Sequence, residues 1–478
     1  MENIEIFKII YSLSQELKIP IYIVGGFVRD QLVNKGHKKD LDFVVEGSGI
    51  VFATKFAELL GEEKASLVPF ADFDTARVVI KNEEGVGIVE LEFAGARTEQ
   101  YEEHSRKPKV ASATLEHDLS RRDFTVNAMA RQICEGGILG ELIDPFEGEK
   151  DLKNKTIKTP LDPNVTFSDD PLRMMRAARF AAQLEFEVDT ETYAAIVTNR
   201  ERLKIISSER ITEELFKLLN SRVPSVGLWI LYETGLFDEF LPEVRELAGV
   251  EEVAGYTHKD NLSHTFAVVD NIAQFTTKPL LRYAALMHDI AKPDTKLFVP
   301  GRGWTFDMHD HLGKKMVKDL GRRLRMSKHD TDYVAKLVRW HLQPIALMDE
   351  EITDSAVRRL IVNLGDDLEA LLMLCRSDIT TGNQKKKEKR LQNYDILERR
   401  IEEVRETDRL RAFQSPVRGE EIMELCGLKP GPTIGKIKEA LEEAILEGII
   451  PNEYEATKEY FFKIKDEFLA SAADWEKK

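Results

Sequence analysis

The feature that most restricts the fold of this 478-residue chain lies in residues 21–45. A short apolar run, IYIV, meets Gly25 and Gly26 and continues into a helical pattern. Glycines at a strand-to-helix turn let backbone N–H groups approach a phosphate. Asp40 and Asp42 then open a second apolar strand, and their i, i+2 spacing places both carboxylates on one face. Two adjacent carboxylates favour a bound cation, and Mg²⁺ accepts such a pair together with substrate phosphates.

The periodicity of the sequence changes along the chain. Within residues 1–150, short β-rich runs bounded by Gly, Asp or Asn predict strands, with a helix between Val51 and Leu60. From about residue 168 onwards, long helical periodicity dominates. The predicted strands lie at 21–24, 41–45, 76–80 and 88–93. The first part is therefore predicted to be α/β and the rest mostly α-helical.

Composition excludes several classes of protein. With 42% hydrophobic and 32% charged residues, the chain is neither collagen-like nor disordered, and its length predicts two to four domains. No apolar run approaches the roughly 18 residues of a membrane span, and the first ten residues carry acids rather than the basic residues of a signal peptide. The cysteines form no CxxC pair. We expect a cytoplasmic protein with no membrane partner. The net charge of −16 argues, at long range, against a polyanionic partner.

A second cluster of charged residues is SRRDFTVNAMA at 120–130. Arg121, Arg122 and Asp123 precede a partly apolar segment in which Asn127 is an unusual polar insertion. An arginine can bind triphosphate oxygens through two hydrogen bonds, so the segment is a candidate nucleotide site. The alternative is a structural Arg–Asp pair.

Glu90 and Glu92 form another same-face carboxylate pair on a predicted strand. Glu92 is the better candidate for a third carboxylate near a metal, because its apolar neighbours bury the opposite face. An exposed polar edge of the strand is an equally good interpretation.

A strong helix is predicted over 167–186, with Asp170 as N-cap before Pro171. Arginines recur at every third position of this helix and have no acidic partner at i+4, so we expect their ridge to bind an anion. These residues are Arg173, Arg176 and Arg179.

GG-x-VRD, DxD and RRDFTxNA together resemble the signature motifs of the class II tRNA nucleotidyltransferases, which include CCA-adding enzymes and bacterial poly(A) polymerases of the polymerase β superfamily. The resemblance implies an α+β fold class, in which a polymerase β-like head with a mixed sheet is followed by mostly α-helical parts. It also implies that Asp40 and Asp42 hold catalytic Mg²⁺ ions. The motif glycine and arginine of the family fall on Gly26 and Arg29. The triphosphate-binding arginine falls on Arg122.

The family's EDxxR motif matches DDPLR, which departs from it by carrying Asp169 instead of Glu. The resemblance implies that Asp170 and Arg173 hydrogen-bond the base edge of the incoming CTP or ATP. It also places Arg176 and Arg179 in nucleotide-contacting positions. In a later segment that resembles ER-x-x-EL, we interpret Glu209 and Arg210 as structural.

Histidines and aspartates occur in metal-ligand order between residues 258 and 378. An adjacent His-Asp pair followed by a distant Asp resembles the HD phosphohydrolase superfamily, and two more histidines supply the positions of its dinuclear members. Imidazole and carboxylate ligands suit a divalent transition metal. The predicted ligands are His264, His288, Asp289, His309, His341 and Asp378, whereas His258 and His311 do not fit the order.

The resemblance implies a nucleotidyltransferase head at 1–150, a helical neck that recognises the base at 151–245, an HD domain at 246–390 and an RNA-binding helical tail at 391–478. In the tail, Gly431 and Gly435 near a helix start are candidate RNA contacts, with a helix cap at Pro432 as the alternative. The basic run at 382–390 is either a solvated helix start or loop or a nucleic-acid contact, and it could mark a domain boundary.

The predicted activity is addition of CMP and AMP, from CTP and ATP, to the tRNA 3′ end without a nucleic-acid template. Three alternatives stay open: a poly(A) polymerase or an enzyme that adds only A or only CC, an HD nucleotide phosphohydrolase, and a non-catalytic RNA-binding protein. No protein partner is implied. We expect RNA contact at one basic surface within the first 180 residues, where the predicted anion-binding arginines lie.

Overall fold

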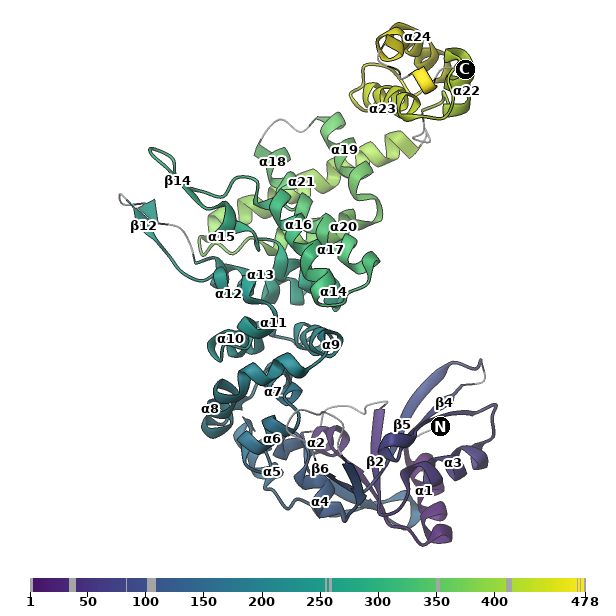
Figure 1. The fold of residues 1–478 in the computed structure, drawn as a ribbon, viewed down its shortest axis with the longest axis vertical. Coiled ribbons are helices and arrows are strands. Elements are labelled where there is room, and N and C mark those ends of the chain that lie inside the picture. Colours follow the sequence, from purple (N-terminus) through teal and green to yellow (C-terminus); the bar gives the residue numbers. More distant parts are fainter. Residues whose placement is uncertain are drawn as a thin grey trace. The chain divides into compact units, whose positions relative to one another are not determined.

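The structure, a computed structural model, describes residues 3–33, 40–82, 84–100, 109–253, 256–257, 260–349, 353–409, 415–470, 472 and 474–476 (Figure 1). The chain divides into two compact units. Unit 1 comprises Met1–Ala248 and Arg322–Met326, and unit 2 comprises Gly249–Gly321 and Ser327–Lys478. None of the helices in these described ranges is long and apolar enough to cross a membrane.

The head of unit 1 is a seven-stranded mixed sheet with the order β3-β4-β5-β2-β1-β8-β9. The β2–β5 pair is parallel, whereas β1 is antiparallel to both β2 and β8, which confirms the predicted mixed sheet. The strands are β1 (Ile21–Val24), β2 (Asp40–Val45), β3 (Ala65–Phe70), β4 (Thr75–Lys81), β5 (Gly87–Gly95), β8 (Ala130–Ile133) and β9 (Leu139–Ile143). A separate ribbon is formed by β6 (Arg97–Gln100) and β7 (Lys109–Ser112).

The apolar core of the head orients the acidic strand β2. Along β2, Leu41 and Phe43 are buried whereas Asp40 and Asp42 are exposed, so the alternation sends both carboxylates to the same open face. Phe43 stacks on Phe93 of β5, with ring centroids 5.1 Å apart. The helices of the head are α1 (Asn3–Leu17), α2 (Gly26–Leu32), α3 (Gly49–Leu60) and α4 (Leu115–Ser120).

The remainder of unit 1 is mostly helical, as predicted, but the helix expected over 167–186 is divided. One helix ends at Asp169 and the next begins at Leu172, because Asp170 adopts an extended conformation and Pro171 follows it. Asp170 therefore lies between the two helices and is not part of either. The helices are α5 (Gly148–Asn154), α6 (Pro163–Asp169), α7 (Leu172–Leu184), α8 (Thr190–Asn199), α9 (Ser208–Leu219), α10 (Pro224–Glu233), α11 (Phe237–Phe240) and α12 (Pro242–Glu246).

Unit 2 is built from helices and two short β-ribbons, β12–β13 (Glu252–Val253, Tyr256–Thr257) and β14–β15 (Leu297–Val299, Gly303–Thr305). The boundary expected at residue 390 falls inside α21, whereas the basic run at 382–390 begins in the break before this helix and continues exposed along its first turns, as a solvated helix start does. The helices are α13 (Asn261–Ala273), α14 (Pro279–Met287), α15 (Lys292–Thr295), α16 (His309–Arg323, which ends in unit 1), α17 (Lys328–Trp340), α18 (Gln343–Asp349), α19 (Asp354–Leu364), α20 (Leu368–Ser377), α21 (Gln384–Arg409), α22 (Gly419–Cys426), α23 (Pro432–Leu446) and α24 (Tyr454–Ala470).

The last three helices enclose a small apolar core of their own around Ile437, Leu441 and Phe461. The start of α23 is already occupied by a side chain of this core region. Glu476 accepts a hydrogen bond from the backbone N–H of Thr433 (2.9 Å), and a Cβ atom at Gly431 would lie 2.2 Å from the carboxylate. Gly431 is therefore the N-cap of α23, as the helix-cap alternative expects, while an RNA contact at Gly431 or Gly435 stays a prediction.

Candidate functional site

A polar pocket of about 300 Å³ in unit 1 brings together residues from three of the predicted motifs. It joins the DxD strand, the RRD segment and the first two turns of α7. Acidic and basic side chains dominate its wall, as a site for a metal-bound polyphosphate requires. Its lining is Asp42, Phe43, Thr75, Glu92, Ala94, Arg121, Arg122, Asp123, Asp170, Arg173, Arg176 and Arg210.

Gly25 lies at the closest approach between the glycine turn and this pocket. Its φ of 71° and ψ of −131° belong to a backbone region that L-residues avoid. A Cβ atom there would lie 3.2 Å from a guanidinium nitrogen of Arg122 and 3.8 Å from Oδ2 of Asp42. The glycine therefore gives the arginine and the aspartate room to approach each other. Gly26, the next residue, begins α2.

Four carboxylates share one face of the strands β2 and β5. The parallel register pairs Asp40 with Glu90 and Asp42 with Glu92. Arg77 of β4 lies 3.5 Å from Glu90 and 3.7 Å from Glu92 and offsets part of the negative charge. The donors are all oxygens, which suits a hard divalent cation. In the described ranges, no third donor joins Asp40 and Asp42 within 4.8 Å, so such an ion would also need water or substrate oxygens.

The two pocket arginines of the RRD segment are held by one buried carboxylate that the sequence did not suggest. Asp118 in α4 accepts hydrogen bonds from Nε of Arg121 (3.1 Å) and from a terminal nitrogen of Arg122 (3.2 Å). Burial opposes ionisation of Asp118, but the two guanidinium groups outweigh it and lower the pKa. Arg122 lines the pocket with a side chain that is about one fifth exposed, while its Nε is buried and has no hydrogen-bond partner among the described residues.

Asp123 is the centre of a second network, which crosses from the head to α7. Its carboxylate accepts hydrogen bonds from Nε of Arg176 (2.9 Å) and from the side-chain amide of Asn127 (3.0 Å). Although burial raises the pKa of Asp123, the Arg176 ion pair and the Asn127 hydrogen bond lower it to about 2. The structural Arg–Asp pair considered from the sequence is therefore present, with Arg176 as the arginine.

Arg29 belongs to the same network and lies under the pocket rather than in its wall. Its guanidinium donates to Asn127 (2.6 Å) and to Asp30 (2.8 Å), and only 4% of the residue is exposed. Direct contact of Arg29 or Asn127 with a triphosphate therefore has no support in this arrangement. Both residues instead hold Asp123 in place.

The arginine ridge of α7 does have acidic partners, contrary to the expectation from its sequence. Nε of Arg179 donates to Glu214 of α9 (2.6 Å), and its guanidinium stacks on Phe180, 4.0 Å from the ring centroid. Arg176 is likewise paired, with Asp123. The error arose because i+4 spacing tests only partners on the same helix. Arg173 lines the pocket and donates to the backbone carbonyl of Arg121 (2.5 Å).

Asp170 combines a helix-capping contact with a position in the pocket. Its Oδ1 accepts the backbone N–H of Leu172 (3.2 Å), and its Oδ2 lies 3.6 Å from the guanidinium of Arg210. Arg210, interpreted from the sequence as structural, lines the pocket and is a candidate site residue that sequence reasoning missed. No local signal distinguishes it, because its neighbours in the pocket come from distant segments.

All six predicted HD ligands lie together in unit 2, at the ends and first turns of helices. Nε2 of His264 and of His288 lie 2.9 and 3.6 Å from Oδ1 of Asp378. Nε2 of His309 and of His341 lie 3.3 and 3.7 Å from Oδ1 of Asp289. The donors form two groups, each able to hold one metal ion. The other oxygen of Asp289 faces His288 (3.2 Å) and His264 (3.6 Å), so this carboxylate lies between the two groups.

The histidines of the HD cluster are oriented for metal binding by the hydrogen bonds of their second nitrogens. Nδ1 of His288, His309 and His341 each lies 2.7 Å from a backbone carbonyl, those of Ala285, Phe306 and Val338. A carbonyl only accepts, so each Nδ1 carries a proton and each Nε2 faces the cluster, where loss of its own proton would make a lone pair available to a metal.

The electrostatics of the cluster point the same way. Burial opposes protonation of His288, but Asp289 and Asp378 outweigh it and raise the pKa of the imidazole to about 10. The buried carboxylates thus generate a field that a divalent cation would neutralise. His258 lies outside the described residues, and His311 is half exposed, 3.9 Å from Asp310.

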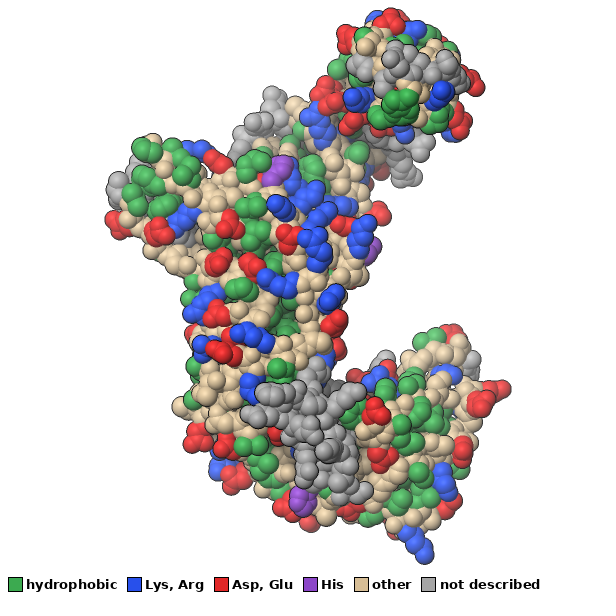
Figure 2. Space-filling model, in the orientation of Figure 1, with side chains coloured by type: hydrophobic (Ala, Val, Ile, Leu, Met, Phe, Trp, Pro, Cys, Tyr) green, Lys and Arg blue, Asp and Glu red, His purple; other side chains and the backbone are tan. Residues whose placement is uncertain are grey.

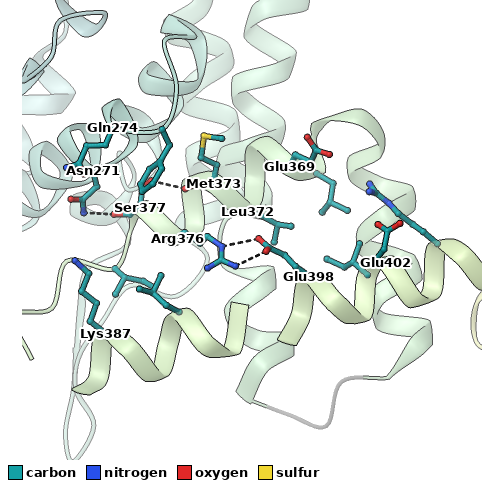
Figure 3. Close-up of a pocket in the computed structure, with 16 residues that line it drawn as sticks. Asn271, Gln274, Glu369, Leu372, Met373, Arg376, Ser377, Lys387, Glu398 and Glu402 are labelled. Carbon is teal, nitrogen blue, oxygen red and sulfur yellow. Dashed lines mark hydrogen bonds and ion pairs between the residues drawn. The ribbon is translucent and has the colours of Figure 1, made fainter. Parts of the chain in front are cut away.

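A larger cavity of about 720 Å³ in unit 2 contains none of the predicted site residues (Figure 3). It lies between α13, α20 and α21, where Arg376 donates to both carboxylate oxygens of Glu398 (3.0 and 2.7 Å). Its wall carries equal numbers of acidic and basic side chains, so charge favours neither anions nor cations. The charged residues are Glu369, Arg376, Lys387, Glu398, Glu402 and Arg405.

Three segments of the chain match described protein families. Residues 21–158 match the poly(A) polymerase head domain, and residues 185–247 match a probable RNA- and SrmB-binding site of polymerase A. Residues 261–371 match the HD domain. The first match contains the DxD and RRD motifs, and the third contains all the HD histidines and Asp289.

Curated relatives are similar over most of the chain. An A-adding tRNA nucleotidyltransferase of Deinococcus radiodurans is 33% identical over 72% of this chain and 78% of its own length. A multifunctional CCA protein of Aliivibrio salmonicida is 32% identical over 75% of this chain and 84% of its own length.

Solved structures share the fold. The CCA-adding enzyme of Bacillus stearothermophilus in complex with CTP aligns with a TM-score of 0.65 and 22% identity, over 99% of this chain and all of that one. The Thermotoga maritima CCA-adding enzyme complexed with tRNA aligns with a TM-score of 0.57 and 19% identity, over 96% and 95% of the two chains. At these identities the alignments establish the fold.

Proposed function

Because the chain belongs to the family of tRNA nucleotidyltransferases with a poly(A) polymerase head, we propose that it adds CMP and AMP, from CTP and ATP, to the 3′ end of tRNA without a nucleic-acid template. One observation carries the proposal. The pocket of unit 1 holds a DxD carboxylate, the RRD arginines and Asp170, which lies just before α7, around a single space.

The reaction is an in-line attack of the terminal ribose 3′-hydroxyl on the α-phosphate of the nucleotide, with pyrophosphate as leaving group. Asp40 and Asp42 would hold Mg²⁺, which, when bound, lowers the pKa of the attacking hydroxyl and neutralises the leaving oxygens. Arg122, whose guanidinium lines the pocket, binds the triphosphate. Asp118 fixes Arg121 and Arg122 in the wall of the pocket, so their charges are in place before the nucleotide arrives.

Base selection is proposed for Asp170 and Arg173, which offer an acceptor and a donor on one side of the pocket. A carboxylate accepts from the exocyclic amino group that cytosine and adenine share, and guanidinium donates to the neighbouring ring nitrogen. Uracil presents a carbonyl in place of that amino group, so Asp170 repels it. Arg210 would hold the carboxylate of Asp170 in its orientation.

Extension of a single tRNA that lacks its CCA end tests this proposal. CTP alone should add two nucleotides, ATP alone should add none, and both together should add three, as resolved on a sequencing gel. Addition of A only to a tRNA that already ends in CC would identify an A-adding enzyme, and untemplated runs of A a poly(A) polymerase. Asp42→Asn should abolish incorporation while leaving tRNA binding intact, and retained incorporation would refute the role of Asp42 in metal binding.

A second activity, metal-dependent phosphohydrolysis, is proposed for unit 2. It is favoured by the convergence of four histidine Nε2 atoms and two carboxylates in two adjacent groups. A transition metal such as Mn²⁺, Ni²⁺ or Zn²⁺ suits these ligands and, when bound, supplies a nucleophilic hydroxide. Release of phosphate from nucleotides in the presence of each metal is the test, with His288→Ala as the inactive control.

A further inference from the structure

We infer that the exposed side of α16 binds the phosphate backbone of the tRNA. This surface, the α16 lysine face, consists of Lys314, Lys315 and Lys318 in unit 2. The inference rests on the proposed function, since it assigns a second contact surface to the same substrate. It lies outside residues 185–247, which match an RNA-binding segment of polymerase A. It also lies outside the first 180 residues and outside the tail at 391–478, the parts in which the sequence led us to expect RNA contact.

The sequence around this face is strongly basic within an acidic protein. Residues 314–328 contain seven lysines or arginines and a single acid, Asp319, whereas the whole chain has a net charge of −16. A solvated helix in an acidic protein does not need such an excess of one sign. Clusters of like charge on one side of a helix are typical of nucleic-acid contacts.

The packing of α16 turns its lysines outward. The opposite side of the helix is buried through Gly313, Val317 and Leu320, and a Cβ atom at Gly313 would lie 3.0 Å from Val338 of α17. Lys314 and Lys318 are one helical turn apart, roughly 6 Å along the axis, and therefore share one side. In the space-filling view, lysine and arginine side chains gather over α16 and α17 (Figure 2).

The charge of the face is largely uncompensated. Lys314 and Lys315 are exposed and have no acidic partner within the described ranges. Lys318 lies 3.4 Å from Asp332, but both side chains are about half exposed, so water screens the pair. Asp310, the other acid near the start of α16, is turned inward, where Arg339 of α17 neutralises it. Asp319 of α16 is exposed as well, so a polyanion would meet three cations flanked by two exposed carboxylates, Asp319 and Asp332, and the face keeps a positive excess.

RNA is the occupant that this chemistry favours. The phosphates of a nucleic-acid strand present a row of negative charges, and lysines bind them as point charges while releasing condensed counterions. Contacts of this kind add affinity and fix the position of the duplex without reading its sequence. They suit an enzyme that must accept every tRNA. The lysine face is expected to bind the tRNA body rather than its reacting 3′ end.

The test is the salt dependence of tRNA affinity in the full-length protein. The triple variant Lys314→Gln, Lys315→Gln, Lys318→Gln should bind tRNA more weakly at low salt. The slope of log Kd against log salt concentration should fall by about 2, since each phosphate contact contributes about 0.7–0.9. A matched triple variant, Lys8→Gln, Lys64→Gln, Lys153→Gln, changes the net charge equally at exposed sites elsewhere and should keep the wild-type slope.

Two further measurements keep the result interpretable. Replacement of the three lysines by arginine should restore the wild-type slope, because charge rather than lysine geometry is required. Nucleotide incorporation at saturating tRNA should be the same in all variants. The inference is overturned if the α16 variant and the matched control bind tRNA with the same affinity and the same salt slope. It is also overturned if the α16 variant differs from the control only in its binding to anionic phosphatidylserine vesicles. Absence of incorporation by the wild-type protein would instead refute the proposed function.

Discussion

The carboxylate of Asp170 is shared between the start of a helix and a cation. One oxygen accepts the backbone N–H of Leu172, and the other lies 3.6 Å from the guanidinium of Arg210 in α9. The two interpretations of Asp170 from the sequence, N-cap and base selector, are therefore compatible, because different oxygens serve them. A substitution that keeps the cap and removes the charge separates the two roles.

Asp170→Asn is that substitution, since asparagine caps helices as well as aspartate does. We expect the free energy of unfolding to change by less than about 1 kcal/mol. Incorporation should lose its preference for CTP and ATP over UTP and GTP, because the amide no longer presents a charged acceptor. Misincorporation assays with each single nucleotide measure this. Unchanged selectivity together with unchanged stability would leave Asp170 with the capping role alone.

Asp118→Asn should impair nucleotide binding without any direct contact between Asp118 and the nucleotide. The amide cannot neutralise Arg121 and Arg122, which then lose their fixed positions, so KM for CTP and ATP should rise more than kcat falls. Unfolding should become easier by about 1–3 kcal/mol, since a buried charge pair is broken. Asp144→Asn is the matched control, because Asp144 also caps a helix in the head but contacts neither arginine. Equal effects of both variants on KM would contradict the positioning role.

The low pKa of Asp123 predicts that the folded protein loses stability in acid. Its pKa of about 2 in the folded chain lies below the ordinary value of 3.8, so its ionised form stabilises the fold above about pH 4. This contribution, about 2 kcal/mol, is lost as the pH falls from about 4 to 2. The free energy of unfolding, measured with urea, should therefore differ between the wild type and Asp123→Asn at pH 7. The two values should converge near pH 2. If the two unfolding free energies differ by the same amount at every pH in this range, the low pKa of Asp123 is refuted.

Gly25→Ala should reduce nucleotide incorporation by displacing Arg122 and Asp42, which lie close to the glycine. The φ of 71° strains an alanine by about 1–3 kcal/mol, and its methyl group would crowd Arg122. We expect incorporation to fall more than tenfold while far-UV circular dichroism is unchanged. Gly61→Ala, at φ 81° with no atom near its Cβ position, is the control for backbone strain alone. If both variants lose activity equally, proximity to the pocket is irrelevant.

The HD cluster should be separable from nucleotide incorporation. His288→Ala and Asp289→Ala remove donors from the metal groups of unit 2, so the metal content measured by mass spectrometry and any phosphohydrolase activity should both fall. Addition of CMP and AMP should stay within about twofold of the wild type, since the proposed transferase site lies in unit 1. A proportional loss of both activities in folded variants would argue against two independent sites.

The sequence by itself determined the features that depend on local patterns. Alternation along β2 predicted that Asp40 and Asp42 share a face, because side chains in a strand alternate regardless of which strand pairs with it. The motif spacing also predicted a mixed-sheet head, a helical remainder and six HD ligands that do come together. These inferences needed only strand and helix periodicity and the chemistry of the side chains.

Only the tertiary structure decided which charged residues satisfy one another. Arg176 and Arg179 looked unpartnered because Asp123 and Glu214 lie 53 and 35 residues away in the sequence. Arg210 looked structural, yet it lies in the pocket beside Asp170. An ion pair forms wherever the fold brings opposite charges within a few ångströms, and sequence separation says nothing about that distance. The packing of α7, α9 and the head therefore decides which arginines are held in ion pairs and which face the pocket.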